Sequence, residues 1–164
     1  MTNVIGLSPG IDVSAYQRTV NWPEVAKTQR FAIIKLGGGE AAQPFIDRYA
    51  IANVDAAWKT SLSVHGYWFF SGRNTNASQM AVLLDALGRV KKKPAMLWVD
   101  IEDKSRDDPR IPSTWTEPTE IDRGLAFADA LELATGIRVG IYTGAWWWDE
   151  RWPRSAAKRL GEVG

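Results

Sequence analysis

Two carboxylates, Asp100 and Glu102, directly follow an apolar run at residues 95–99. Such a run is typical of a strand that is buried on both faces. Because side chains alternate along a strand, Asp100 and Glu102 share one face, with Cα atoms about 6.5–7 Å apart, and Ile101 points to the other. Burying a charge is costly, so carboxylates at this position are expected to have a catalytic, metal-binding or structural role. The open interpretations are acid catalysis, metal binding, and structural caps or ion pairs.

The elements that position these acids alternate between strands and helices. Strand-like segments fall at residues 10–14, 31–36, 63–70, 95–99 and 137–143, and helix-like segments at residues 22–28, 45–59, 76–90, 119–135 and 153–160. Five βα units in a row predict a parallel sheet with right-handed crossovers, in either an open doubly wound sheet or a (β/α) barrel. In both architectures the active site lies at the carboxyl ends of the strands, where Asp12 of the first strand also falls.

Three local patterns give sharper predictions. Asn21 is expected to cap the first helix, with Pro23 in its first turn. A 3–4 residue apolar spacing predicts that the second helix begins at Phe45. The glycines at residues 37–39 lack the spacing of a phosphate-binding loop, so we expect a flexible turn or a close approach of the backbone to a ligand.

Two further segments bear on the site. His65 is the only histidine, and it lies early in its strand, so we expect a structural role. A His-based triad or metal cluster would have no second member. The polar segment at residues 103–118 is long enough to be a functional loop, and Trp115 within it is a candidate to line a cleft.

Composition narrows the class of protein. The 164 residues, 45% hydrophobic and 24% charged, fit one globular domain, and a net charge of +1 argues against a nucleic-acid partner. The absence of cysteine excludes disulfides and Cys-based zinc sites. No apolar stretch is long enough to span a membrane. The first ten residues do not resemble a signal peptide, so we expect synthesis in the cytoplasm and release by another route.

Six short motifs follow one another along the chain: Gly10-Ile11-Asp12-Val13-Ser14 with Tyr16-Gln17, Asn21-Trp22, Phe31-Ala32-Ile33-Ile34-Lys35, Gly66-Tyr67-Trp68-Phe69-Phe70, Asp100-Ile101-Glu102 and Gly140-Ile141-Tyr142-Thr143. Together they resemble glycoside hydrolase family 25, the Chalaropsis-type lysozymes that are common among phage endolysins. The resemblance spans nearly the whole chain. It implies a TIM-type (β/α) barrel that cleaves the β-1,4 bond between N-acetylmuramic acid and N-acetylglucosamine in peptidoglycan.

The resemblance also implies roles for individual residues. Glu102 matches the family's general acid, Asp100 its partner carboxylate and Asp12 the acidic residue of the first strand. Like-charge repulsion from Asp12 and Asp100 favours the protonated form of Glu102, as proton donation to a glycosidic oxygen requires. The N-acetyl group of the substrate is expected to act as nucleophile, oriented by Asp100, with retention of configuration. The expected substrate-binding residues are Tyr67, Tyr142, Gln17 and Trp115.

The number of strands departs from the family. A family barrel has eight strands, whereas this sequence supplies about five, so we predict one family 25-like catalytic domain over residues 1–164 that lacks the C-terminal strands. Three explanations stay open. The chain is a fragment, a second chain or a homo-oligomer completes the barrel, or the domain is an open sheet that binds glycan without cleaving it.

Three functions stay open for these residues. The first is a muramidase that acts on peptidoglycan glycan strands at the bacterial cell wall, without metal or cofactor. The second is a non-catalytic cell-wall glycan-binding module, which would keep the aromatic residues but would not need all three acids. The third is metal-dependent hydrolysis by carboxylates, which no histidine cluster supports.

Overall fold

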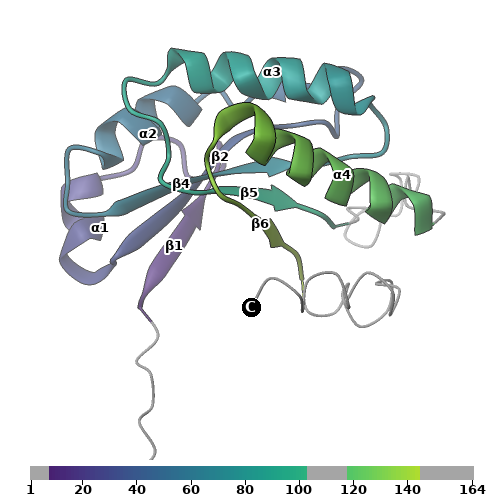
Figure 1. The fold of residues 1–164 in the computed structure, drawn as a ribbon. Helices are drawn as coiled ribbons and strands as arrows, with labels where there is room; N and C mark the ends of the chain where they lie inside the picture. Colours follow the sequence, from purple (N-terminus) through teal and green to yellow (C-terminus); the bar gives the residue numbers. More distant parts are fainter. Residues whose placement is uncertain (1–7, 103–117, 145–164) are drawn as a thin grey trace, which may run out of the picture.

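The computed structural model describes residues 8–102 and 118–144, and these form a six-stranded sheet with four helices (Figure 1). In chain order the elements are β1 (Gly10–Val13), α1 (Trp22–Thr28), β2 (Phe31–Gly38), β3 (Phe45–Ile46), α2 (Ala50–Ala57), β4 (Ser63–Phe69), α3 (Asn76–Arg89), β5 (Leu97–Asp100), α4 (Pro118–Thr135) and β6 (Val139–Tyr142). The helix predicted at residues 153–160 lies outside the described residues.

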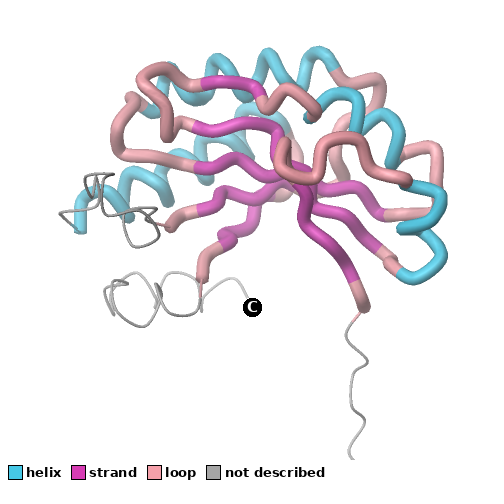
Figure 2. Tube along the Cα trace, turned by 180° about the vertical axis from the view of Figure 1, so that it is seen from behind, coloured by secondary structure: helices cyan, strands magenta, loops and turns pink. Residues whose placement is uncertain are grey.

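The sheet has the order β1-β2-β4-β5-β6, and all neighbours on this path are parallel. Helices α2, α3 and α4 cover one face, as Figure 1 and the reverse view in Figure 2 show. The predicted α/β class with a parallel sheet is therefore confirmed. The described strands form an open sheet with β1 and β6 at its edges, and no closed barrel is seen among them.

The core lies between the sheet and its helical layer. Its strand residues include Ile34, Leu36, Val64, Trp68, Leu97 and Val99, and its helix residues include Val54, Leu83, Leu87, Phe127 and Leu131. Ile101, just beyond β5, is fully buried in the same layer. It sits so close to α4 that a Cβ added at Gly124 would lie 2.8 Å from its Cδ1 atom. Alternation along the chain then turns Asp100 and Glu102 to the opposite side.

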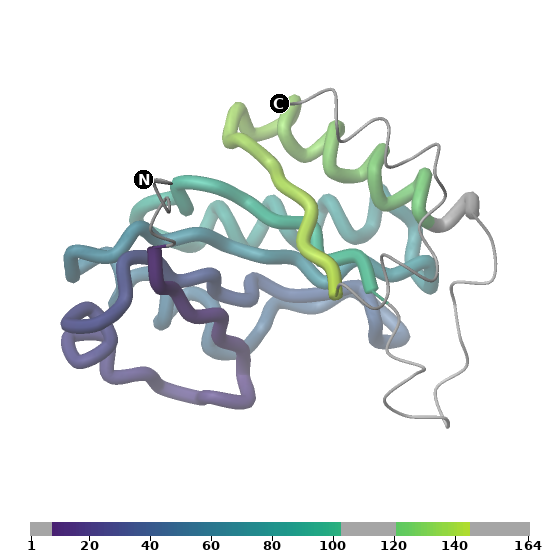
Figure 3. Tube along the Cα trace, turned by 90° about the horizontal axis from the view of Figure 1, so that it is seen from below, coloured from purple at the N-terminus to yellow at the C-terminus, as the bar shows by residue number. Residues whose placement is uncertain are grey.

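The opposite face of the sheet, which we call the open face, is not covered by any of the described helices (Figure 3). Stacked rings line its floor. Phe31 stacks on His65 with centroids 5.8 Å apart, and His65 on Trp98 at 6.3 Å. The strand at residues 95–99 was predicted to be buried on both faces. Trp98 is only half-buried, because no described helix covers its side of the sheet.

His65 is held between two polar neighbours near the amino end of β4, in line with a structural role. The indole Nε1 of Trp98 donates to His65 Nδ1 at 3.2 Å, and Ser63 Oγ lies 3.0 Å from Nε2. Since Nδ1 accepts, the ring proton is assigned to Nε2. Protonation of Nδ1 would set two donors against each other and break the bond to Trp98.

Stability should consequently depend on the protonation of His65. Burial lowers the pKa of His65 from its ordinary value of 6.5. The unfolded chain then binds the proton more readily than the folded protein does. The contribution of the neutral ring to the free energy of unfolding is therefore fully present above about pH 6.5, and it is lost as the pH drops through the folded pKa. His65 is the only histidine. The urea midpoint of the variant His65→Gln should therefore change less with pH than that of the wild type between about pH 5 and pH 7.5. An equal pH dependence in both proteins would contradict this assignment.

The glycines at the end of β2 have a different role from the one predicted. The second helix begins at Ala50 rather than at Phe45, and β3 instead pairs antiparallel with Gly37 and Gly38 at the end of β2. A Cβ at Gly37 would overlap the carbonyl oxygen of Phe45, so glycine permits the close approach of β3. These two glycines therefore serve strand pairing rather than a flexible turn.

The start of α1 is only partly as predicted. Asn21 occupies the N-cap position and Pro23 lies in the first turn, but the Asn21 side chain makes no capping hydrogen bond. The helix is anchored instead by Trp22, which is buried and donates from Nε1 to Asn53 Oδ1 at 3.2 Å. A tertiary contact thus takes the place of the expected local cap.

Candidate active site

A pocket lies on the open face at the carboxyl ends of the strands. Its lining residues are Asp12, Ile33, Tyr67, Asp100, Glu102 and Tyr142. All three predicted acids and both predicted tyrosines are therefore brought together. In a flat sheet β1 and β5 would lie three strand spacings apart, about 14 Å. The arch of the sheet, visible in Figure 1, lets both line one pocket.

Strand pairing fixes the backbone on which two of the acids stand. Asp100 is the last residue of β5, 4% exposed, and its carbonyl oxygen accepts from the Phe70 amide at 2.9 Å. The Ile101 amide donates to the Tyr142 carbonyl at 2.9 Å, and Thr143 Oγ1 donates to the Ile101 carbonyl at 2.7 Å. The hydrogen bonds to both neighbouring strands hold the chain between Asp100 and half-buried Glu102.

The pocket concentrates negative charge around two phenols. The rings of Tyr67 and Tyr142 stack with centroids 6.4 Å apart. Burial raises the pKa of Tyr142, and three nearby carboxylates raise it further: Asp12, Asp100 and Glu102. Burial also raises the pKa of Tyr67, again with contributions from surrounding carboxylates, Asp100 foremost. Both phenols stay protonated at neutral pH, so they can donate hydrogen bonds to a ligand, and the carboxylates can stabilise developing positive charge.

The remaining predicted site residues are placed differently. Gln17 does not line the pocket: its Oε1 accepts from the Ser14 amide at 2.8 Å and closes the turn after β1. Trp115 lies outside the described residues. A role for either side chain in substrate binding therefore stays a prediction.

Sequence reasoning missed Asp47, a buried carboxylate that supports the pocket from outside. It is 5% exposed and accepts from the Ala15 amide at 2.8 Å and the Tyr49 amide at 2.9 Å. These bonds tie the loop after β1 to the start of α2. The charge of Asp47 also contributes to the raised pKa of Tyr67. The bond between Asp47 and the Ala15 amide spans 32 positions, so no local pattern signals it.

Gln79 of α3 was also missed, and it organises the loop after β4. Its side chain is fully buried. Its Oε1 accepts from Trp68 Nε1 and from the Ser71 amide, both at 3.2 Å. Its Nε2 donates to the carbonyls of Ser71 at 2.8 Å and Asn74 at 3.1 Å. One amide thus joins a strand, a loop and a helix at the carboxyl end of the sheet.

Comparison with known families agrees with this architecture. The sequence profile described as Glycosyl hydrolases family 25 matches residues 11–160. The chain belongs to this family. The resemblance seen in the six motifs is therefore confirmed. A search of curated protein sequences finds no match.

Solved structures of other proteins share the fold. A family 25 glycosyl hydrolase from Bacillus anthracis is 27% identical, with a TM-score of 0.68 over 88% of this chain and 66% of its own. A muramidase from Trichobolus zukalii is 25% identical, with a TM-score of 0.67 over 87% and 68%. The catalytic domain of an endolysin from bacteriophage P40 of Listeria monocytogenes, 19% identical, gives 0.68 over 87% and 66% and so supports the fold alone. The chain spans about two thirds of these structures.

No helix in residues 8–102 and 118–144 is both long and apolar enough to cross a membrane. In the same ranges, no group of three or more His, Cys, Asp or Glu side chains is arranged to hold a metal ion.

Proposed function

We propose that this protein is a lysozyme-type glycoside hydrolase that cleaves the β-1,4 bond between N-acetylmuramic acid and N-acetylglucosamine in peptidoglycan. The observation that carries the proposal is the pocket at the strand ends, which Asp12, Asp100 and Glu102 line together in a member of Glycosyl hydrolases family 25. The Trichobolus zukalii relative is described as a muramidase, and this supports the same substrate here.

In this mechanism each acid has a separate task. Glu102 gives its proton to the glycosidic oxygen as the bond from the anomeric carbon breaks. The acetamido oxygen of the N-acetylmuramic acid bonds to the anomeric carbon of the same sugar from the face opposite the leaving oxygen. Asp100 orients the acetamido group. Asp12 contributes negative charge that stabilises the oxocarbenium-like transition state. Water then gives a proton to the Glu102 carboxylate, bonds to the anomeric carbon and displaces the acetamido oxygen, so the product retains the β configuration.

Digestion of purified peptidoglycan tests the reaction. Borohydride reduction of the fragments, followed by mass analysis, should find the new reducing ends on muramic acid. New ends on glucosamine would overturn the proposed bond. Binding of the protein to cell walls without any cleavage would favour the alternative, a non-catalytic glycan-binding module.

The same proposal includes a closed (β/α) barrel. A second chain, or a second copy of this chain, would supply the strands that complete it. The support is that β1 and β6 are edges of the described sheet, and open parallel edges expose unpaired backbone groups. The native mass in solution tests it. A particle of 18.3 kDa would contradict the second chain, and a larger one would support it.

The bacterial cell wall is the proposed site of action. The support is family membership and the likeness in fold to a phage endolysin domain.

A further inference from the structure

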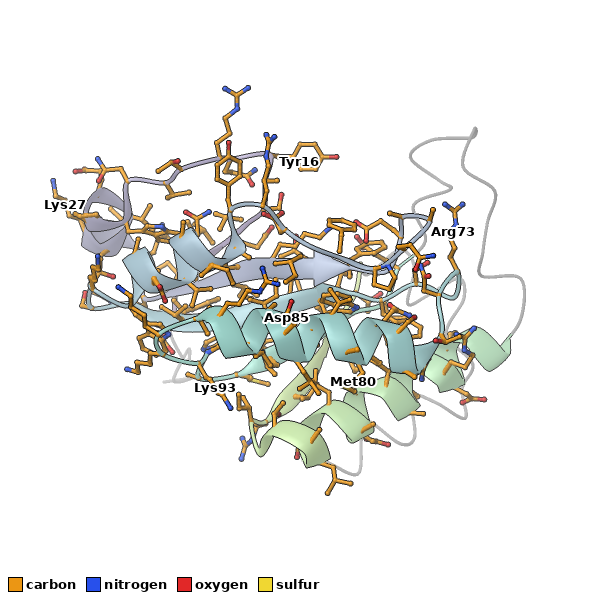
Figure 4. The ribbon with its side chains drawn as sticks, turned by 90° about the horizontal axis from the view of Figure 1, so that it is seen from above. Tyr16, Lys27, Arg73, Met80, Asp85 and Lys93 are labelled. Atoms are coloured by element: carbon orange, nitrogen blue, oxygen red, sulfur yellow. The ribbon has the colours of Figure 1, made fainter. Side chains whose placement is uncertain are left out.

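The loop that follows β1 carries an exposed aromatic ring, Tyr16, four residues after the pocket residue Asp12. Tyr16 is 90% exposed, the largest exposed fraction among the large hydrophobic residues of the described chain. Figure 4 shows its side chain extending outward from this loop. Tyr16 follows Asp12 by four residues, so their Cα atoms are at most about 14 Å apart. A single exposed aromatic residue is ordinary in itself. The loop that carries Tyr16, however, is held by hydrogen bonds from buried side chains.

Two buried side chains hold the loop on either side of Tyr16. The carboxylate of Asp47 accepts from the Ala15 amide at 2.8 Å, and the Asn53 Nδ2 donates to the Arg18 carbonyl at 3.1 Å. Asp47 and Asn53 are 5% and 4% exposed, so both anchors belong to the interior. The backbone that carries the ring is therefore fixed to the body of the protein.

The loop is also braced internally. The Gln17 amide donates to the Ser14 carbonyl at 3.1 Å, and the Arg18 amide donates to the Ala15 carbonyl at 3.2 Å. Arg18 has a φ of 57°, in the left-handed region that non-glycine residues rarely adopt. A conformation of this kind persists where its surroundings enforce it, often at ligand sites. Ligand binding would then have little backbone freedom to remove, and the ring has only two side-chain torsions to fix.

We propose that Tyr16 is a stacking platform for one sugar ring of the glycan strand, outside the pair of sugars whose bond is cleaved. The inference rests on the proposed function. The face of a tyrosine ring is electron-rich, and it suits the weakly positive C–H face of a pyranose. Because Tyr16 follows the pocket residue Asp12 by only four positions, its ring is within reach of a sugar just beyond the pair in the pocket. The platform contributes affinity and sets the length of glycan that binds best.

The test measures kcat and KM on soluble peptidoglycan glycan strands for three variants. Tyr16→Ala should raise KM roughly five- to twentyfold with kcat within about twofold, because the contact is equal in ground and transition states. Tyr16→Phe keeps the ring and should keep most of the affinity. Leu133→Ala is the matched control: Leu133 is 89% exposed on α4, and its removal should change neither constant.

Each result decides the proposal. An unchanged KM in Tyr16→Ala, or a fall in kcat alone, overturns the platform. If the wild-type protein cleaves no glycan, the proposed function fails, and co-sedimentation with purified peptidoglycan then judges Tyr16 independently. Binding by the wild type that weakens in Tyr16→Ala but not in Leu133→Ala supports the platform. Equal binding by all variants, or none by the wild type, overturns it.

Discussion

Replacing Glu102 with Gln should lower kcat on peptidoglycan by about 10²- to 10⁴-fold. The amide has nearly the shape of the acid but cannot give a proton to the leaving glycosidic oxygen. The side chain is half-buried, and it lies just after β5 in backbone held by its neighbours. The fold should therefore survive, as circular dichroism and the thermal midpoint would report. Initial rates of reducing-end release at saturating peptidoglycan measure the effect.

Glu24→Gln is the matched control for this experiment. Glu24 is an exposed residue of α1 that pairs with Lys27 on the surface, and an exposed ion pair contributes little to stability. The control should retain the wild-type rate within about twofold. If Glu102→Gln also kept more than about a tenth of that rate, Glu102 would not be the general acid.

Replacing Gln79 with Leu should lower the free energy of unfolding by about 3–5 kcal/mol. Leucine fills a similar volume but makes none of the four hydrogen bonds of the amide. The indole N–H of Trp68, both backbone groups of Ser71 and the carbonyl of Asn74 would lose their partner. Each buried group left without a bond costs about 1–3 kcal/mol, less where water reaches it.

Urea unfolding measures the loss, with Gln43→Leu as the control. Gln43 is exposed, so its replacement should change the stability by no more than about 0.5 kcal/mol. A loss below about 1 kcal/mol in Gln79→Leu would mean that the loop finds other partners. In that case Gln79 would not organise the carboxyl end of β4.

The central features of the site follow from local sequence patterns. Once residues 95–99 are recognised as a strand, side-chain alternation alone sends Ile101 to one face and turns Asp100 and Glu102 to the other. The alternation of strands and helices then predicts that the first strand ends on the same side. This places Asp12 at the same edge of the sheet as the other two acids, and the arch of the sheet then brings all three into one pocket. The alternation of side chains and the shared edge need no long-range contact, whereas the arch depends on the whole sheet.

The features that were missed depend on contacts distant in sequence. Phe45 fits a helical spacing, but pairing with the glycines of β2 draws it into a strand. Gln79 looks like a surface residue of an amphipathic helix, and only the loop at residues 71–74 explains its burial. Asp47 carries no local signal for its bond to Ala15. The half exposure of Trp98 reflects a face without a described helix, which periodicity does not report.

A crystal structure of the Glu102→Gln variant with a bound peptidoglycan oligosaccharide would test the account most directly. We expect an N-acetylmuramic acid–N-acetylglucosamine linkage in the pocket, with its glycosidic oxygen within about 3.2 Å of the side chain at position 102. Asp12 and Asp100 should face the muramic acid ring. An oligosaccharide bound away from these three side chains, or a linkage that only aromatic residues touch, would contradict a catalytic role for them.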